Sequence, residues 1–229
     1  MNTKVVTFDC YGTLIDWDRG VLSAVRSSCP ASIFLDDRTV LQAFDQAEAI
    51  ELSGCYRPYQ DVLAGTGRSI ARKFNLGSSE LASALSTSVG GWPAFDDTVS
   101  ALTTVRDAFP SLRIGILSNI DTDLLQKTMR QQFGEFRPDF TITAESVRSY
   151  KPGLAHFEKM LATVGCHPSE ILHVAQSVRH DIVPGRRLGL QTCWVRRRRL
   201  GAELVRNAQS DHVIDTLGEL HSLLEGMQE

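Results

Sequence analysis

The feature that most constrains the fold is a series of short apolar runs that alternate with longer helical patterns. Four runs are short, apolar and ended by polar or turn residues, which is typical of buried strands; they cover residues 4–8, 113–117, 171–174 and 192–195. Weaker runs at residues 140–143 and 213–214 predict two more strands. Helical spacing predicts helices at residues 97–109, 121–133 and 153–164, the last starting from the proline of Lys151-Pro152. This alternation predicts an α/β fold with a doubly wound parallel sheet and helices on both faces.

Residues 16–91 interrupt the alternation. They contain amphipathic helical patterns, such as residues 39–52 and 59–74, and no convincing strand. The segment ends at Gly90-Gly91-Trp92-Pro93, which predicts a hinge. We therefore expect a Rossmann-like core domain formed by residues 1–15 and 93–229, with an inserted α-helical cap domain at residues 16–92.

Composition excludes several classes of protein. A net charge of −3 over 229 residues gives no general reason to expect a nucleic-acid partner. The run Arg196-Arg197-Arg198-Arg199 is interpreted as a solvated rim, with an anion-attracting or interface patch as the alternative. No segment has the roughly 18 apolar residues of a membrane span, and no leader pattern is visible. Five scattered cysteines without a CxxC pair indicate reduced thiols. These features predict a cytoplasmic protein without a membrane partner.

Polar residues follow the predicted strands where each strand ends. They are Asp9, the pair Ser118-Asn119, Lys151 and the segment from Gln176 to Asp181. Ligands of open parallel sheets bind outside the carboxyl ends of the strands. We therefore expect these side chains to meet at one edge of the sheet. Cys10, beside Asp9, is interpreted as a packing residue.

Four motifs at these positions resemble those of one superfamily. They are FDCYGTL at residues 8–14, ILSN at 116–119, SYKP at 149–152 and HVAQSVRHD at 173–181. Together they resemble the haloacid dehalogenase superfamily of hydrolases, and more closely its type II 2-haloacid dehalogenase branch. The resemblance covers nearly the whole chain, including the cap. It implies an aspartate nucleophile that becomes transiently esterified by a small anionic substrate, and it suggests a homodimer.

The resemblance also implies roles for individual residues. Lys151 would keep the nucleophile Asp9 ionised, because a nearby cation lowers the pKa of a carboxyl group. Thr13 would orient Asp9, and Asp181 would hold Lys151 or help water attack the ester. The implied catalytic residues are Asp9, Thr13, Lys151 and Asp181, and the implied substrate-binding residues are Tyr11, Trp17, Ser118, Asn119, Gln176 and Ser177.

Two departures from the superfamily pattern bear on the reaction. Phosphatases of the superfamily typically have a second aspartate two residues after the nucleophile, where this chain has Tyr11. They also have a magnesium-binding carboxylate at the position of Gln176, whose neutral amide is a weak ligand for Mg²⁺. The sequence therefore favours displacement at carbon of a small 2-substituted carboxylic acid without a cofactor. A phosphatase that uses Mg²⁺ is the alternative.

Other departures concern the leaving group. The branch normally has a Trp-Arg pair on its first long cap helix to receive the halide, and here the pair is Phe44-Asp45. Arg57 or Arg38 could replace the missing cation. Phe157 stands where the branch has a tyrosine.

These changes leave two further alternatives. One is ring opening of a strained carboxylate such as azetidine-2-carboxylate, with Asp45, Tyr11 or His180 as the acid that protonates the amine. The other is a catalytically silent binding module. Retention of Asp9, Lys151 and Asp181 argues against the second alternative.

Overall fold

The protein is built on a six-stranded parallel sheet with the strand order β3-β2-β1-β4-β5-β6. The computed structural model describes residues 3–30, 32–197 and 209–228. The order reverses beside β1, which pairs with β2 on one side and with β4 on the other. This arrangement confirms the predicted Rossmann-like, doubly wound sheet. The strands are β1 (Val5–Phe8), β2 (Arg113–Ser118), β3 (Phe140–Thr143), β4 (Ile171–Ala175), β5 (Gln191–Val195) and β6 (His212–Ile214).

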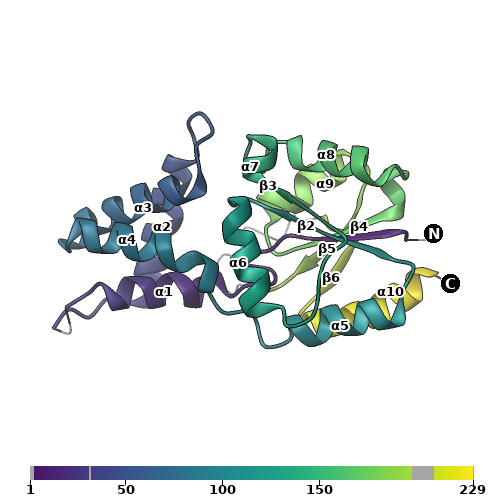
Figure 1. The fold of residues 1–229 in the computed structure, drawn as a ribbon, viewed down its shortest axis with the longest axis horizontal. Coiled ribbons are helices and arrows are strands. Elements are labelled where there is room, and N and C mark those ends of the chain that lie inside the picture. Colours follow the sequence, from purple (N-terminus) through teal and green to yellow (C-terminus); the bar gives the residue numbers. More distant parts are fainter. Residues whose placement is uncertain (1–2, 31, 198–208, 229) are drawn as a thin grey trace.

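Helices cover both faces of this sheet. Figure 1 shows α5 and α10 on one face and α8 and α9 on the other. The helices of this part of the chain are α5 (Thr98–Ala108), α6 (Thr122–Gln132), α7 (Ala144–Val147), α8 (Ala155–Val164), α9 (Val183–Arg187) and α10 (Leu220–Gln228). The strand bounds lie within one residue of the predicted ones. The helix expected at residues 153–164 begins instead at Ala155, because Pro152 and Gly153 lie in a turn that is closed by Gly153 N donating to Tyr150 O.

Four further helices lie beyond the carboxyl ends of the strands (Figure 1). They are α1 (Trp17–Ser27), α2 (Asp37–Glu51), α3 (Tyr59–Phe74) and α4 (Ser78–Ser88). The chain enters and leaves this group side by side: Ile15 forms an antiparallel bridge with Ala94, and Asp16 N donates to Pro93 O at 2.8 Å. The helical character of this segment agrees with the predicted insertion. Its boundaries as a separate cap domain, residues 16–92, stay a prediction.

One core residue holds the helical group over the sheet. The N-terminus of α3 has no side-chain cap from its own N-cap residue, Pro58. Instead, the carboxylate of Asp121 accepts hydrogen bonds from Tyr59 N at 2.8 Å and Gln60 N at 3.0 Å. A carboxylate at a helix N-terminus satisfies free N–H groups and interacts favourably with the helix dipole. Asp121 therefore docks α3 beside the strand end that carries Ser118.

The arginine run differs from its predicted role as a solvated rim. The Arg197 side chain is only 8% exposed and pairs with both carboxylate oxygens of Asp97, at 2.6 and 2.8 Å. Its Nε also donates to Thr13 O at 3.1 Å, so Arg197 braces the turn that follows β1. Arg196 is exposed and pairs with Asp215, whereas Arg198 and Arg199 lie outside the described residues. The prediction was wrong for Arg197 because tertiary contacts give it a half-buried carboxylate partner, Asp97.

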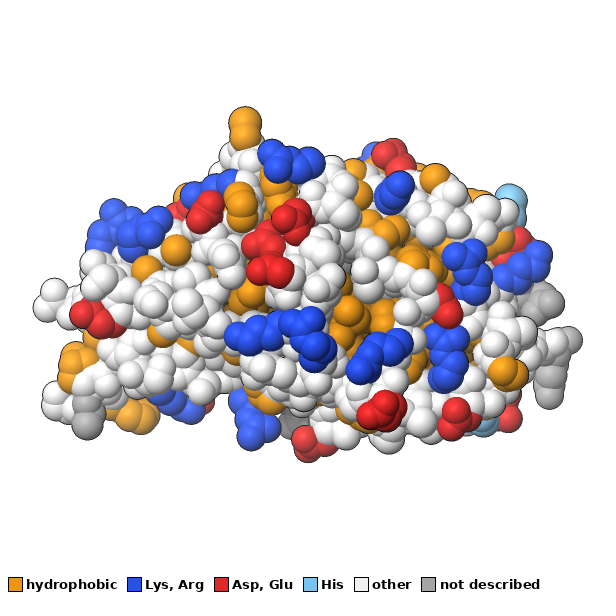
Figure 2. Space-filling view, in the orientation of Figure 1, with side chains coloured by type: hydrophobic (Ala, Val, Ile, Leu, Met, Phe, Trp, Pro, Cys, Tyr) orange, Lys and Arg blue, Asp and Glu red, His pale blue; other side chains and the backbone are white. Residues whose placement is uncertain are grey.

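The surface seen in Figure 2 carries charged side chains of both signs, interspersed with small apolar patches. Within residues 3–30, 32–197 and 209–228, none of the helices combines the length and the apolar character needed to cross a lipid bilayer.

Helices α3 and α4 approach so closely that Gly67 has no room for a side chain. A Cβ at this position would lie 2.7 Å from Ala82 Cα and 2.9 Å from Leu81 O. We predict that Gly67→Ala lowers the free energy of unfolding by about 1–3 kcal/mol, because the two backbones must separate. Urea denaturation would measure this loss. Gly226→Ala is the matched control, because a Cβ there meets no atom within 4 Å; it should raise stability by about 0.5–1 kcal/mol. Equal effects of the two substitutions would contradict the prediction.

Candidate active site

Asp9 follows β1 directly and lies at the carboxyl edge of the sheet. The turn after it is closed by three backbone N–H groups, those of Thr13, Leu14 and Ile15, which all donate to Cys10 O. Gly12 has φ of +93°, a conformation that a side chain would strain. The turn brings Thr13 back onto the nucleophile candidate: Thr13 Oγ1 donates to Asp9 Oδ2 at 2.7 Å. Cys10 is fully buried in the apolar core, as expected of a packing residue.

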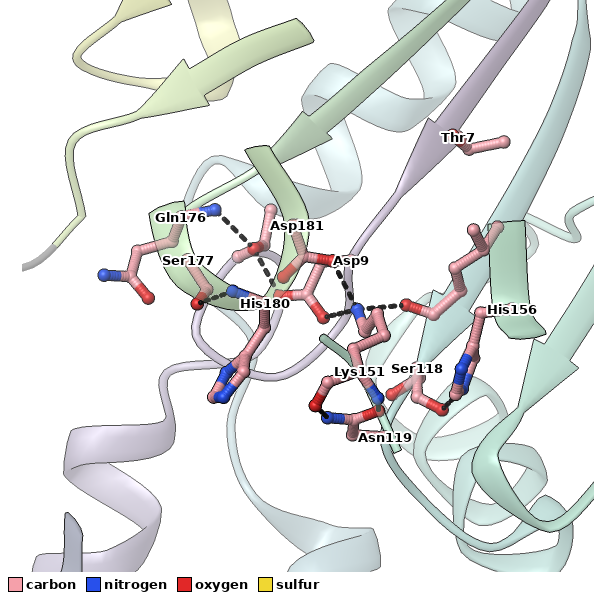
Figure 3. A network of polar contacts seen from close by, with 12 residues as sticks. Thr7, Asp9, Ser118, Asn119, Lys151, His156, Gln176, Ser177, His180 and Asp181 are labelled. Atoms are coloured by element: carbon pink, nitrogen blue, oxygen red, sulfur yellow. Dashed lines mark hydrogen bonds and ion pairs between the residues drawn. The ribbon is translucent and has the colours of Figure 1, made fainter. Parts of the chain in front are cut away.

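Lys151 joins three different parts of the sheet edge through its ammonium group (Figure 3). Its Nζ donates to Asp9 Oδ1 at 2.9 Å, to Asp181 Oδ1 at 2.5 Å and to Leu117 O at 2.9 Å. An ammonium group has three N–H donors, so all of them are used. The backbone of Lys151 is held by Asn119, whose Oδ1 accepts from Lys151 N and whose Nδ2 donates to Lys151 O. The lysine is therefore fixed at both ends.

Asp181 is anchored from behind by a buried polar pair that sequence reasoning did not identify. His173 Nε2 lies 3.1 Å from Asp181 Oδ1, and His173 Nδ1 lies 2.8 Å from Thr7 Oγ1. Thr7 and His173 are register partners in β1 and β4, and both are fully buried. The available signal was a histidine inside an otherwise apolar strand, since buried polar groups need partners.

Burial and charge pull the pKa values of this cluster in opposite directions. Burial raises the pKa of Asp9, and this effect outweighs the attraction of Lys151 and the hydrogen bond from Thr13. Burial also opposes ionisation of Asp181, but Lys151 and His173 together hold the pKa of Asp181 below its usual range. Burial lowers the pKa of Lys151, and the two carboxylates more than compensate, so the net shift is upward. Asp181 is therefore the permanent counter-ion, while Asp9 carries its charge at a higher cost.

A cavity of about 560 Å³ opens between this cluster and helix α2. It has the size of a small-molecule site. The lining residues are Asp9, Tyr11, Trp17, Asp45, Glu48, Ala49, Leu52, Ser53, Tyr59, Ser118, Asn119, Tyr150, Lys151, Pro152, Gln176, Ser177, Val178, Arg179, His180 and Asp181. All the implied catalytic and substrate-binding residues lie on this wall except Thr13, which contacts Asp9 from outside the cavity lining.

Several of the proposed substrate-binding residues are engaged by the protein itself. The hydroxyl of Tyr11 lies 2.6 Å from Thr128 Oγ1, so it is held by α6. Gln176 is held through its backbone, which donates to Thr13 Oγ1 and accepts from Trp194 Nε1. The hydroxyl of Ser177 accepts from His180 N and caps the next turn. Trp17 packs edge-on against Phe44.

The side of the cavity formed by helix α2 is acidic. Asp45 lies on its wall, as does Glu48, to which the Tyr59 hydroxyl donates. Neither Arg57 nor Arg38, the two cations considered as substitutes, lines the cavity. Arg57 forms an ion pair with Glu51. Sequence reasoning missed Glu48 and Tyr59, which no motif marks. It gave no role to Tyr150 or Arg179, although Tyr150 lies in the SYKP motif and Arg179 lies in the HVAQSVRHD motif.

Magnesium would find a poor set of ligands here. The two carboxylates near the cavity floor, Asp9 and Asp181, both bind the Lys151 ammonium group. The position that could add a third oxygen is the neutral amide of Gln176. Mg²⁺ prefers charged oxygens in octahedral geometry, so these residues do not fit the ion well.

The site has an aspartate at the end of the first strand and a lysine shared between two carboxylates. Comparison with known proteins identifies the family of the chain. The model of the haloacid dehalogenase-like hydrolases matches residues 3–189. The chain belongs to this family, and it is a hydrolase.

Relatives with different activities match the chain. Haloacetate dehalogenase H-2 of Moraxella sp. is 26% identical and covers 85% of this chain and 86% of its own length. The putative pyrophosphatase PpaX of Clostridium perfringens is 23% identical and covers 97% of both chains. The haloacid dehalogenase-like hydrolase domain-containing protein 3 of Xenopus laevis is 30% identical over 51% of this chain, and the match spans about half, 47%, of that protein.

Solved structures support the fold. The L-2-haloacid dehalogenase of Xanthobacter autotrophicus has a TM-score of 0.79 with 21% identity, and the match covers 98% of this chain and 99% of that one.

Loss of the shared ammonium should destabilise the protein in a way that depends on pH. Without Lys151, burial and mutual repulsion would raise the pKa values of Asp9 and Asp181 above their unfolded values of about 4. The folded state would then bind more protons than the unfolded state, so stability would fall as pH rises through those raised values. We predict that Lys151→Met costs about 3–5 kcal/mol at pH 7, and clearly less near pH 4.5.

Urea unfolding of the native chain and the variant at both pH values would measure this difference. Lys159→Met is the control, because Lys159 lies exposed on α8; it should change stability by less than about 0.5 kcal/mol at either pH. A loss for Lys151→Met that is the same at both pH values would contradict the prediction.

Proposed function

We propose that this protein hydrolyses a small 2-substituted carboxylic acid by displacement at carbon, with Asp9 as the nucleophile and without a metal cofactor. The observation that carries the proposal is the identity and the contacts of two residues on the cavity wall, Tyr11 and Gln176. Tyr11 stands where a phosphatase needs a second carboxylate, and its hydroxyl is hydrogen-bonded to Thr128. Gln176 supplies a neutral amide where a carboxylate would hold magnesium.

The contacts of Asp9 suit attack on carbon. One oxygen is held by Lys151 and the other by Thr13, so the carboxylate is oriented before substrate arrives. An Asp9 oxygen would attack carbon 2 from the side opposite the substituent, which departs with the bonding electrons. Water would then attack Cγ of the Asp9 ester and release a 2-hydroxy acid with inverted configuration. A halide leaving group needs no acid for this step.

His180 has properties that suit the second step. Burial lowers the pKa of this imidazole, so it is neutral at pH 7 and can accept a proton. It lines the same cavity as Asp9. Asp181, by contrast, is occupied with Lys151 and His173, which supports a holding role.

Phosphoryl transfer is the second candidate, and the pyrophosphatase relative favours it. It would need a magnesium site that the residues near Asp9 support poorly. Ring opening of a strained carboxylate also remains compatible with the cavity, because Asp45 and His180 line it and either could protonate an amine. These reactions differ in what they release, so one assay separates them.

The decisive experiment follows L-2-chloropropionate and an aryl phosphate, each with and without EDTA. We expect halide release that survives EDTA and is lost in Asp9→Asn, whose fold is checked by circular dichroism. A single turnover in ¹⁸O-water with excess enzyme should give a product that contains unlabelled oxygen from Asp9 and a protein that gains the label. Phosphate release that requires Mg²⁺ would replace the proposal with the phosphatase candidate.

The acid limb of the pH profile should report Asp9. Activity must fall as pH drops through the pKa of Asp9, because only the ionised carboxylate attacks. Burial raises that pKa above the ordinary aspartate value, and the hydrogen bond from Thr13 lowers it. We predict that Thr13→Val moves the acid limb of kcat/KM to higher pH. Thr163→Val, an exposed change on α8, is the control and should leave the limb in place. An unmoved limb in Thr13→Val would contradict this assignment.

A further inference from the structure

The cavity needs a cation to hold an anionic substrate. Four carboxylates line it: Asp9, Asp45, Glu48 and Asp181. They repel a second anion, most strongly where water is excluded. A carboxylic acid substrate, the one assumption taken from the proposed function, must therefore find a positive group on the wall. The branch-specific arginine is replaced by Asp45, so this group comes from elsewhere.

Lys151 cannot supply this contact. Its three N–H donors are already bound to Asp9, Asp181 and Leu117 O. Releasing one of them would uncover a buried carboxylate or carbonyl, which costs more than a new contact returns. His180 is neutral at pH 7, because burial lowers its pKa. The cap arginines are also excluded: Arg57 is paired with Glu51 and does not line the cavity.

Arg179 is the remaining cation among the described residues on the cavity wall. Its guanidinium group forms no hydrogen bond or ion pair with any described residue. A guanidinium group is charged at every physiological pH, and its planar fork matches the two oxygens of a carboxylate. We propose that Arg179 is the anion-binding residue of the cavity and receives the carboxylate of a small carboxylic acid.

The backbone around Arg179 explains how a residue that follows β4 reaches the cavity wall. Residues Val178–Ile182 form one turn of π-helix, in which both Asp181 N and Ile182 N donate to Ser177 O, at 3.1 and 3.2 Å. Such a turn is wider than an α-helical one and is frequent at functional sites. Asp181 points inward to Lys151 and is 1% exposed, whereas Arg179 is exposed at the cavity. One turn thus supplies the buried counter-ion and the accessible cation.

Binding of an unreactive carboxylate tests the proposal without turnover. Propionate, which has no leaving group, and neutral propionamide would be titrated into the full chain and followed by NMR. We expect Arg179→Gln to weaken propionate binding at least about tenfold and to leave propionamide binding unchanged. Arg179→Lys, which keeps the charge without the fork, should give an intermediate loss and serves if the glutamine variant does not fold. Arg186→Gln, an exposed change on α9 away from the cavity, is the matched control and should bind like the native chain.

The outcomes separate this proposal from the proposed reaction. Unchanged propionate affinity in Arg179→Gln overturns the role of Arg179, even if the native chain releases halide. Absence of saturable propionate binding by the native chain also overturns it. Propionate binding that depends on Arg179, in a chain that releases no halide from 2-chloropropionate, supports Arg179 and rejects the proposed reaction.

Discussion

The site depends on a single ammonium group shared by two buried carboxylates. Lys151 is 2% exposed, and Asp9 and Asp181 are 7% and 1% exposed, so the charges have little water to stabilise them. Removing one partner from such a cluster leaves an uncompensated buried charge, which costs several kcal/mol. The three charged groups are therefore compatible with the folded state only when all three are present. The completeness of the cluster also orients Asp9, because the contacts that neutralise the carboxylate fix its position.

The sheet brings the partners of this cluster together. Asp9 follows β1, Leu117 O lies at the end of β2 with Asn119 just after that strand, and Asp181 comes from the turn after β4. These strands are neighbours, with β1 in the middle. Because all strands are parallel, their carboxyl ends lie on one edge, and residues far apart in sequence meet there. The Thr7–His173 pair extends the network into the sheet interior and ties the position of Asp181 to the register of β1 and β4.

The two sides of the cavity have different origins. The core side carries the nucleophile candidate, its lysine and the π-helical turn with Arg179. The helical side, held in place by Asp121 at the start of α3, contributes acidic and aromatic groups. Asp45, which the sequence pattern matched to the branch's arginine, is one of the carboxylates on the helical side of the cavity. The negative charge on the helical side therefore disfavours binding of an anion there. This is why we propose that an anionic substrate is held from the sheet side, by Arg179.

The sequence by itself determined the sheet, its strand ends and the identity of Asp9, Lys151 and Asp181. These could be predicted because buried strands are short apolar runs, and because polar residues just after parallel strands must converge. Local sequence patterns could not predict which partner a polar side chain would bind when the fold offers several. Tyr11 was a candidate for contact with substrate, yet its hydroxyl binds Thr128 on α6. Arg197 was interpreted as solvated, yet it is buried against Asp97. Arg179 lies in the fourth motif but received no role from it, and only the structure places it in a π-helical turn on the cavity wall. Tertiary structure decided these cases because long polar side chains take whichever partner the packing of distant elements brings within hydrogen-bonding distance.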